Sequence, residues 1–261
     1  EINGVSLTAE RTLHHLREAG HAVQLVRPRQ PGEAPRDDAQ EWRCASGPIP
    51  RYPDLRFGLA RTGALRARWT SGAGGTPPDL VHVATPGPLG WAALRAARSL
   101  GLRTAADFRT NFHAYSRHYG PGWLEPLVLG YLRRLHQLAD CSFVPTPAMA
   151  RALADSGFER LEVVGRGVDA RHFSPRWRSD ALRRSWDVED GSPVLRHVGR
   201  LAAETNVELA LQAYAWLAGV RPDLRMVVVG DGPCRQRLAQ AHPRVRFVGA
   251  KRGEELGQHY A

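Results

Sequence analysis

The stretch that decides the fold runs Val-Leu-Arg-His-Val-Gly-Arg-Leu-Ala-Ala-Glu-Thr-Asn, from Val194 to Asn206. It predicts a short buried strand, a turn at Gly199, and then Arg200 shortly before a helix. This order directs a guanidinium group and a helix N-terminus into one crevice. Both suit a diphosphate, because helix N–H groups favour an anion and the planar guanidinium matches phosphate oxygens.

The same alternation of apolar runs and helical stretches extends over most of the chain. We expect strands at 22–26, 80–84, 103–108, 141–144, 161–164, 194–198, 225–229 and 245–248, with helices between them. Short apolar strands separated by helices are typical of parallel strands that are buried on both faces. The predicted fold class is therefore α/β, with doubly wound parallel sheets.

The alternation of predicted strands and helices is interrupted twice, and these interruptions indicate the domain organisation. Residues 27–53 are rich in proline and charge and read as a long surface excursion with at most one edge strand. A second break at 167–193 precedes a new series of strands and helices. We therefore expect two Rossmann-like domains, 1–168 and 169–261. The first lacks its first strand, and the second is incomplete, since the chain begins in a loop and stops inside a helix.

Composition narrows the classes of partner. The formal charge is +10, and of the 36 Lys and Arg residues only Lys251 is a lysine, which is typical of a GC-rich genome. A basic chain favours nucleotide phosphates first and an anionic membrane surface second. Nucleic acid is not expected, because no dense basic run with interleaved aromatic residues is present.

Cysteine usage and hydropathy bear on the compartment. The three cysteines lie far apart and form no C-x-x-C motif, so we expect reduced thiols and no metal site. No apolar run approaches the roughly 20 residues that span a bilayer. We expect a cytoplasmic protein, or one peripheral on the inner face of the membrane.

Candidate site residues in the first half occupy two loops. Asn3 and Gly4 precede the first helix, where a glycine lets a bound group approach the backbone. Asp107, Arg109, Asn111 and His113 follow a predicted buried strand. In open α/β sheets, ligands bind beyond the carboxyl ends of the strands, so these side chains would face the crevice. The alternatives are a plain turn for Gly4 and a structural hydrogen-bond network for the others.

Candidates in the second half also follow strands. Gly230-Asp231-Gly232 forms a tight turn before a helix, and the glycines permit close approach of a ligand or serve the turn alone. A nucleotide base or ribose could meet the backbone near Ala250 and Lys251, after the next strand. No G-x-G-x-x-G follows any predicted strand, which disfavours a Rossmann oxidoreductase.

Taken together, these segments resemble glycosyltransferases of family four, which have the two-domain GT-B fold. Within that family, the residues of these motifs most resemble those of the GDP-mannose-dependent α-mannosyltransferases. The motifs occur in the family's order at Asn3-Gly4-Val5, 107–115, Pro145-Thr146-Pro147, Gly167-Val168-Asp169, Val198-Gly199-Arg200-Leu201 and 229–233.

The resemblance implies transfer of a sugar, here mannose, from a nucleotide-sugar donor with retention of configuration. It needs no cofactor or metal, because protein cations stabilise the departing diphosphate. Arg200 would grip the diphosphate that Gly4 admits, with Gly230, Asp231 and Gly232 nearby and Ala250 and Lys251 flanking the base. A lipid or saccharide acceptor would lie on the first domain, near Asn3, Asp107, Asn111 and His113.

Three departures from the family pattern matter. Thr205 stands where the family usually has a diphosphate-binding lysine, and losing such a charge commonly costs on the order of 2–4 kcal/mol in the transition state. Arg109 replaces a frequent histidine; it cannot act as a base, but it could stabilise the leaving group catalytically. The acidic Glu-x7-Glu motif would lie beyond Ala261. We therefore expect this chain alone to be inactive, and the alternative is a degenerate relative that binds a nucleotide sugar or a partner without turnover.

Overall fold

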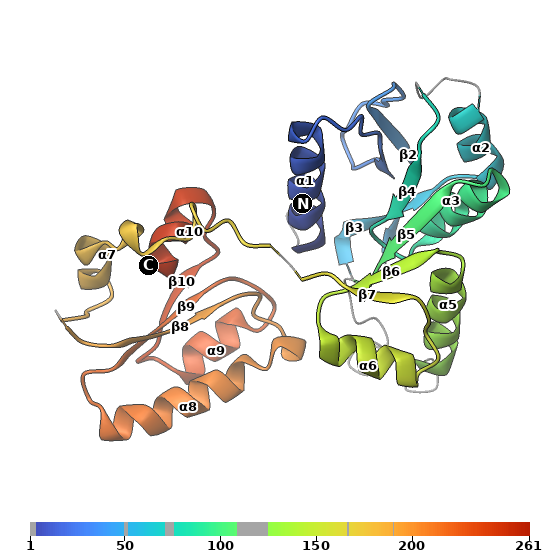
Figure 1. Ribbon diagram of the computed structural model, residues 1–261. Coiled ribbons are helices and arrows are strands. Elements are labelled where there is room, and N and C mark those ends of the chain that lie inside the picture. Colours follow the sequence, from blue (N-terminus) through green and yellow to red (C-terminus); the bar gives the residue numbers. More distant parts are fainter. Residues whose placement is uncertain (1–3, 50–51, 71–75, 109–124, 166, 190) are drawn as a thin grey trace. The chain divides into compact units, whose positions relative to one another are not determined.

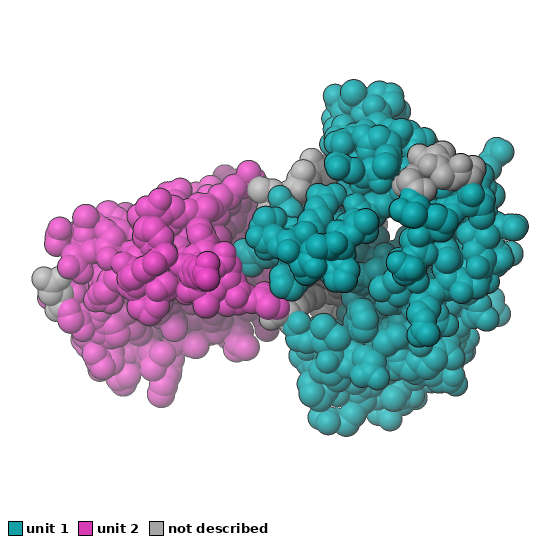
Figure 2. Space-filling view, turned by 45° about the horizontal axis from the view of Figure 1, so that its top comes forward, with its two compact units in different colours: residues 1–166 teal, residues 167–261 magenta. Residues whose placement is uncertain are grey.

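The computed structural model describes residues 4–49, 52–70, 76–108, 125–165, 167–189 and 191–261. The chain divides into two compact units, residues 1–166 and 167–261, shown in teal and magenta in Figure 2. Each unit has its own sheets and its own apolar core, so each is described by itself (Figure 1).

Unit 1 contains a four-stranded parallel sheet in the order β4-β5-β6-β7. Its strands are β4 (Leu80–Val83), β5 (Arg103–Asp107), β6 (Cys141–Val144) and β7 (Leu161–Val163), and its helices include α3 (Pro88–Ser99), α5 (Glu125–Gln137) and α6 (Pro147–Asp155). Helix α3 buries Ala92, Ala93, Ala96 and Ala97 against this sheet. Small side chains on one helical stripe allow the close approach that buries the sheet face.

A second sheet in unit 1 was not expected from the sequence. It has the order β1-β2-β3, with β1 (Leu25–Pro28) parallel to β2 (Glu41–Ile49) and β2 antiparallel to β3 (Tyr52–Leu59). Helices α1 (Gly4–Glu18) and α2 (Thr62–Thr70) belong to the same unit. The prediction of a surface excursion with at most one edge strand over 27–53 is therefore wrong.

Ion pairs explain why a charged segment forms these strands. The Glu41 side chain is 11% exposed and lies 2.7 Å from Arg27 Nε, 3.0 Å from Arg43 Nε and 2.9 Å from Arg36 Nη1. The hydrogen bond from Arg43 is the largest of the effects that lower the pKa of Glu41. Because Glu41 and these three arginines pair with one another, charged residues that resemble a loop in the sequence can line a strand.

Unit 2 is a parallel sheet in the order β10-β9-β8, covered on both faces. Its strands are β8 (Val194–Val198), β9 (Arg225–Val229) and β10 (Arg246–Gly249), and its helices are α7 (Asp180–Arg184), α8 (Val207–Val220), α9 (Arg235–Ala241) and α10 (Gly253–Tyr260), with 3-10 turns at Pro175–Trp177 and Ala203–Thr205. Figure 1 shows α8 and α9 on one side of the sheet and α10 on the other.

The central strand β9 shows how this layering arises. Met226 and Val228 pack in the cluster that includes Leu211 of α8 and Leu238 of α9. Val227 and Val229 point the other way and pack with Trp186 and with Leu256 of α10. A strand with an unbroken run of apolar residues is therefore buried on both faces, as the α/β prediction requires. The predicted fold class is confirmed.

Candidate functional site

Three loops meet at the carboxyl edge of the sheet in unit 2. Gly199 N donates to Val229 O at 3.0 Å, Leu201 N donates to Asp231 O at 2.9 Å, and Gly230 N donates to Gly249 O at 2.9 Å. These backbone bonds join the ends of β8, β9 and β10. They bring seven residues singled out from the sequence to one edge: Arg200, Thr205, Gly230, Asp231, Gly232, Ala250 and Lys251.

Close approach of backbones accounts for the two glycines after β9. Gly230 and Gly232 have φ values of +151° and +155°, where side chains are rarely found. A Cβ atom at Gly230 would lie 1.8 Å from Gly199 O, and one at Gly232 would lie 2.4 Å from Leu201 O. The glycines therefore let this loop lie directly on the loop that carries Arg200.

Thr205 closes the turn in which Arg200 lies. Its Oγ1 lies 2.9 Å from Arg200 O and 2.7 Å from Ala202 O, so its proton can bond to either carbonyl. The same oxygen accepts from Ala202 N at 3.3 Å. Thr205 thus acts on the backbone of the loop, and Arg200 itself is exposed.

Two more cations reach this edge, and each has a carboxylate beside it. Lys251 Nζ lies 2.5 Å from Glu255 Oε1, and this pairing holds the pKa of Glu255 below its usual value. Arg235 Nη1 lies 3.4 Å from Asp231 Oδ2, and its guanidinium also lies beside Gly249. Sequence reasoning missed Arg235. The signal available was its place two residues after Pro233, at the start of the helix that follows the glycine turn.

His197 is a second residue that sequence reasoning missed. It is half-buried near the end of β8, and burial lowers the pKa of its imidazole. Its Nε2 finds no hydrogen-bond partner among the described residues, and a Cβ at Gly199 would lie 3.6 Å from that atom. A neutral imidazole therefore lies beside the turn at Gly199. The signal was a histidine beside Arg196 in a strand whose other three residues are apolar.

Unit 1 offers a different picture at the end of β5. Asp107 is only 6% exposed, and its Oδ2 lies 3.1 Å from Nε2 of His82 on β4. Its carboxylate therefore has a protein partner, as the structural alternative requires. Gly4 is the first residue of α1. Four further predicted site residues, Asn3, Arg109, Asn111 and His113, lie outside the described residues.

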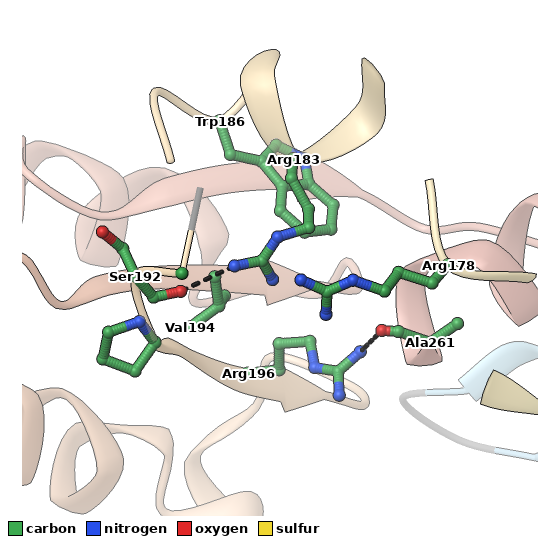
Figure 3. Close-up of a pocket in the computed structure, with 9 residues that line it drawn as sticks. Arg178, Arg183, Trp186, Ser192, Val194, Arg196 and Ala261 are labelled. Atoms are coloured by element: carbon green, nitrogen blue, oxygen red, sulfur yellow. Dashed lines mark hydrogen bonds between the residues drawn. The ribbon is translucent and has the colours of Figure 1, made fainter. Parts of the chain in front are cut away.

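A pocket of about 290 Å³ lies elsewhere in unit 2, and Figure 3 shows the residues that line it. Three arginines line it, namely Arg178, Arg183 and Arg196. Arg183 donates to Ser192 O at 2.6 Å and Arg196 to Ala261 O at 3.1 Å. The pocket contacts Val194, the first residue of β8, whereas Arg200 follows the last. It is therefore separate from the edge that carries the predicted donor residues.

Comparison with known proteins decides the family. The family model for Glycosyltransferase Family 4 matches residues 2–172. The chain belongs to glycosyltransferase family 4. It is also similar to GDP-mannose-dependent α-mannosyltransferases from Mycobacterium tuberculosis and Mycolicibacterium smegmatis, with 36% identity over 266 and 269 residues. In both cases 100% of this chain aligns with 68% of the relative.

A solved structure supports the fold of this family member. The chain is similar to sucrose-phosphate synthase from Thermosynechococcus elongatus with a TM-score of 0.67 and 16% identity, over 99% of this chain and 68% of that one. This likeness supports the GT-B fold. Membership of family 4 and the GDP-mannose-dependent relatives indicate a hexosyltransferase with a nucleotide sugar as substrate. No helix in the described part of the chain is long and apolar enough to cross a membrane.

Proposed function

We propose that this family 4 chain is part of a retaining mannosyltransferase, which transfers mannose from GDP-mannose to a lipid or saccharide acceptor. One observation carries the proposal: the loops after β8, β9 and β10 are bonded together and gather Arg200, Arg235 and Lys251 at one edge. The GDP-mannose dependence of relatives that align with the whole chain supports the donor. If the acceptor is a lipid, the enzyme is proposed to bind peripherally at the inner face of the membrane.

The chemistry proposed for this edge is stabilisation of a leaving diphosphate. When the bond from the sugar to the diphosphate breaks, negative charge grows on the oxygen that departs with GDP. Arg200 is exposed, and its fork of N–H donors suits two phosphate oxygens at once. Preorganised donors of this kind stabilise charge without reorganising in the transition state. The Lys251 and Ala250 loop is proposed to contact the base or ribose.

Unit 1 is proposed to supply the acceptor side. Asn3, Asn111 and His113 remain proposals for acceptor contacts, and Arg109 remains a proposed second catalytic cation. Asp107 enters this proposal as a positioning residue, because its buried carboxylate pairs with His82 on the neighbouring strand β4. Gly4 begins α1, and we propose that the loop before it admits the diphosphate.

The experiment is GDP-mannose turnover by the full-length protein, comparing Arg200→Ala with Arg221→Ala. Arg221 is an exposed arginine at the other end of α8, paired with Asp223, and it serves as the matched control. Loss of one hydrogen-bond donor at a developing anion lowers the rate about 10²–10³-fold. The turnover rate of Arg200→Ala should therefore fall by that factor, while the rate of Arg221→Ala stays near that of the parent. Equal activity of the two variants contradicts the diphosphate assignment. The anomeric configuration of the product, read by proton NMR, tests retention.

A second candidate, nucleotide-sugar binding without turnover, is favoured by Thr205. Its hydroxyl is engaged with the backbone, so it adds no charge where the family pattern has a lysine. Calorimetry with GDP-mannose and turnover assays on Thr205→Lys separate the two candidates. If the parent binds GDP-mannose but only Thr205→Lys turns it over, the parent is a binding protein.

A further inference from the structure

Helix α8 carries an apolar stripe on the face that points away from the sheet. Leu209, Trp216 and Val220 are 62%, 73% and 66% exposed, and Ala213 completes the stripe. The opposite face of the same helix buries Val207, Leu211 and Tyr214 in the core of unit 2. A surface helix is normally polar on its outer face, so this stripe calls for a covering partner.

The stripe has a symmetry that points to the partner. Leu209 and Val220 are equally far from the midpoint between Tyr214 and Ala215, and so are Ala213 and Trp216. An antiparallel pair of α8 helices about a two-fold axis at this midpoint therefore sets Leu209 against Val220 of the second copy. It also sets the large Trp216 ring against the small Ala213, which is the complementarity that closely packed helices need.

Charges at the two ends of α8 fit the same arrangement. Glu208 pairs with Arg237 at 2.6 Å, and Arg221 pairs with Asp223 at 2.9 Å. Glu208 and Arg221 are also equally far from the midpoint, so the antiparallel pair places one complete ion pair from each copy at either end. No lone charge is then brought against the apolar contact, where it would be costly.

We propose that the outer face of α8 is a self-association surface, through which two copies of this chain form an antiparallel, two-fold symmetric pair. A lipid surface fits the stripe less well, because Arg221 at one end of α8 and Arg237 of α9 beside the other end are each paired with a carboxylate. One helix per copy buries on the order of 400 Å² a side, below the size of a standard stable interface. The pair is therefore weak and reversible, with a dissociation constant in the micromolar range or above.

Sedimentation equilibrium of the chain over two decades of micromolar concentration tests the pair. The apparent mass should rise toward that of a dimer, and Trp216→Glu should weaken association at least tenfold by burying a carboxylate. The matched control is Leu127→Glu, a leucine that is 64% exposed on α5 of unit 1. Circular dichroism establishes that both variants fold. A chain that stays monomeric throughout, or two variants that associate alike, overturns the proposal.

Cysteine crosslinking tests the antiparallel geometry. Leu209 and Val220 lie three turns apart on one helix, too far to bridge within a copy. The double variant Leu209→Cys, Val220→Cys should give a covalent dimer on mild oxidation, well above the unsubstituted chain and above either single variant. Equally efficient dimers from the single variants overturn the antiparallel arrangement. A monomer that binds anionic vesicles through Trp216 overturns self-association in favour of a lipid surface.

Discussion

The carboxyl edge of the sheet in unit 2 differs from the end of β5 in unit 1, although both follow buried parallel strands. In unit 2, exposed Arg200 and half-buried Lys251 stand on loops that are bonded to one another. In unit 1, Asp107 is buried and bound to His82, and His136 is buried nearby. A polar residue at the end of a strand is therefore either exposed at the edge of the sheet or held inside the fold, according to its burial and its partners.

The largest effect is expected when the contact between the loops after β8 and β9 in unit 2 is disrupted. Gly230→Ala places a methyl group against Gly199 O, so we expect at least about 3 kcal/mol of destabilisation, confined to unit 2. Hydrogen exchange of peptides from 194–249 should accelerate, while peptides from 80–163 serve as the internal reference. The control is Gly130→Ala in α5, where nothing lies within 4 Å and alanine should stabilise by about 1 kcal/mol. Unchanged exchange in Gly230→Ala would refute the close approach.

Acid should act on unit 1 through His136. Burial lowers the pKa of His136 to about 4 from an ordinary value of 6.5. Between these values the unfolded chain binds a proton that the folded chain does not, so stability falls as the pH falls. The loss is about 1.4 kcal/mol per pH unit, or about 3 kcal/mol from pH 6.5 to 4.

Chemical denaturation of unit 1 as a function of pH measures this slope. His136→Asn should flatten it, whereas His14→Asn, which alters an exposed histidine on α1, should leave it intact. A slope that is the same in all three proteins would remove His136 as its source.

Because Asp107 is buried, we expect its substitution to lower the stability of unit 1 without changing donor binding. Asp107→Asn removes the charge beside His82, and we expect about 2 kcal/mol of destabilisation in unit 1. Binding of GDP-mannose, measured by calorimetry, should be unchanged, because Asp107 is not among the proposed donor contacts. Asp79→Asn, at an exposed aspartate just before β4, is the matched control. Full stability with weakened acceptor turnover would instead make Asp107 a contact of the acceptor.

The smallest expected effect concerns Thr205. Thr205→Val keeps the shape of the side chain and removes the hydroxyl bonded to the backbone at Arg200 and Ala202. We expect about 1 kcal/mol of destabilisation in unit 2 and weaker donor binding, because the turn that presents Arg200 loosens. Thr70→Val, which removes an exposed hydroxyl at the end of α2, should change neither quantity measurably. Identical behaviour of the two variants would deny Thr205 a positioning role.

The sequence predicted strands β4 to β10 and the helices between them, because local patterns of apolar residues and turn residues determine these elements. An apolar run such as Met226-Val227-Val228-Val229 in β9 is typical of a strand buried on both faces, and the residues at its end follow by position. The hairpin of β2 and β3 escaped prediction, because the carboxylate of Glu41 is stabilised by Arg27, Arg36 and Arg43 together, and the pairing with Arg27, 14 residues away, forms only on folding.

By itself, the sequence determined the α/β class, the family and the set of polar residues and glycines at the ends of the strands. Only the tertiary structure decided what those residues do. Gly230 is required by the carbonyl of Gly199, Thr205 holds the backbone at Arg200, and Asp107 is bound to His82. The physical reason is range: periodicity and turn chemistry act between near neighbours in the chain, whereas burial, pairing and close approach join segments that only folding brings together.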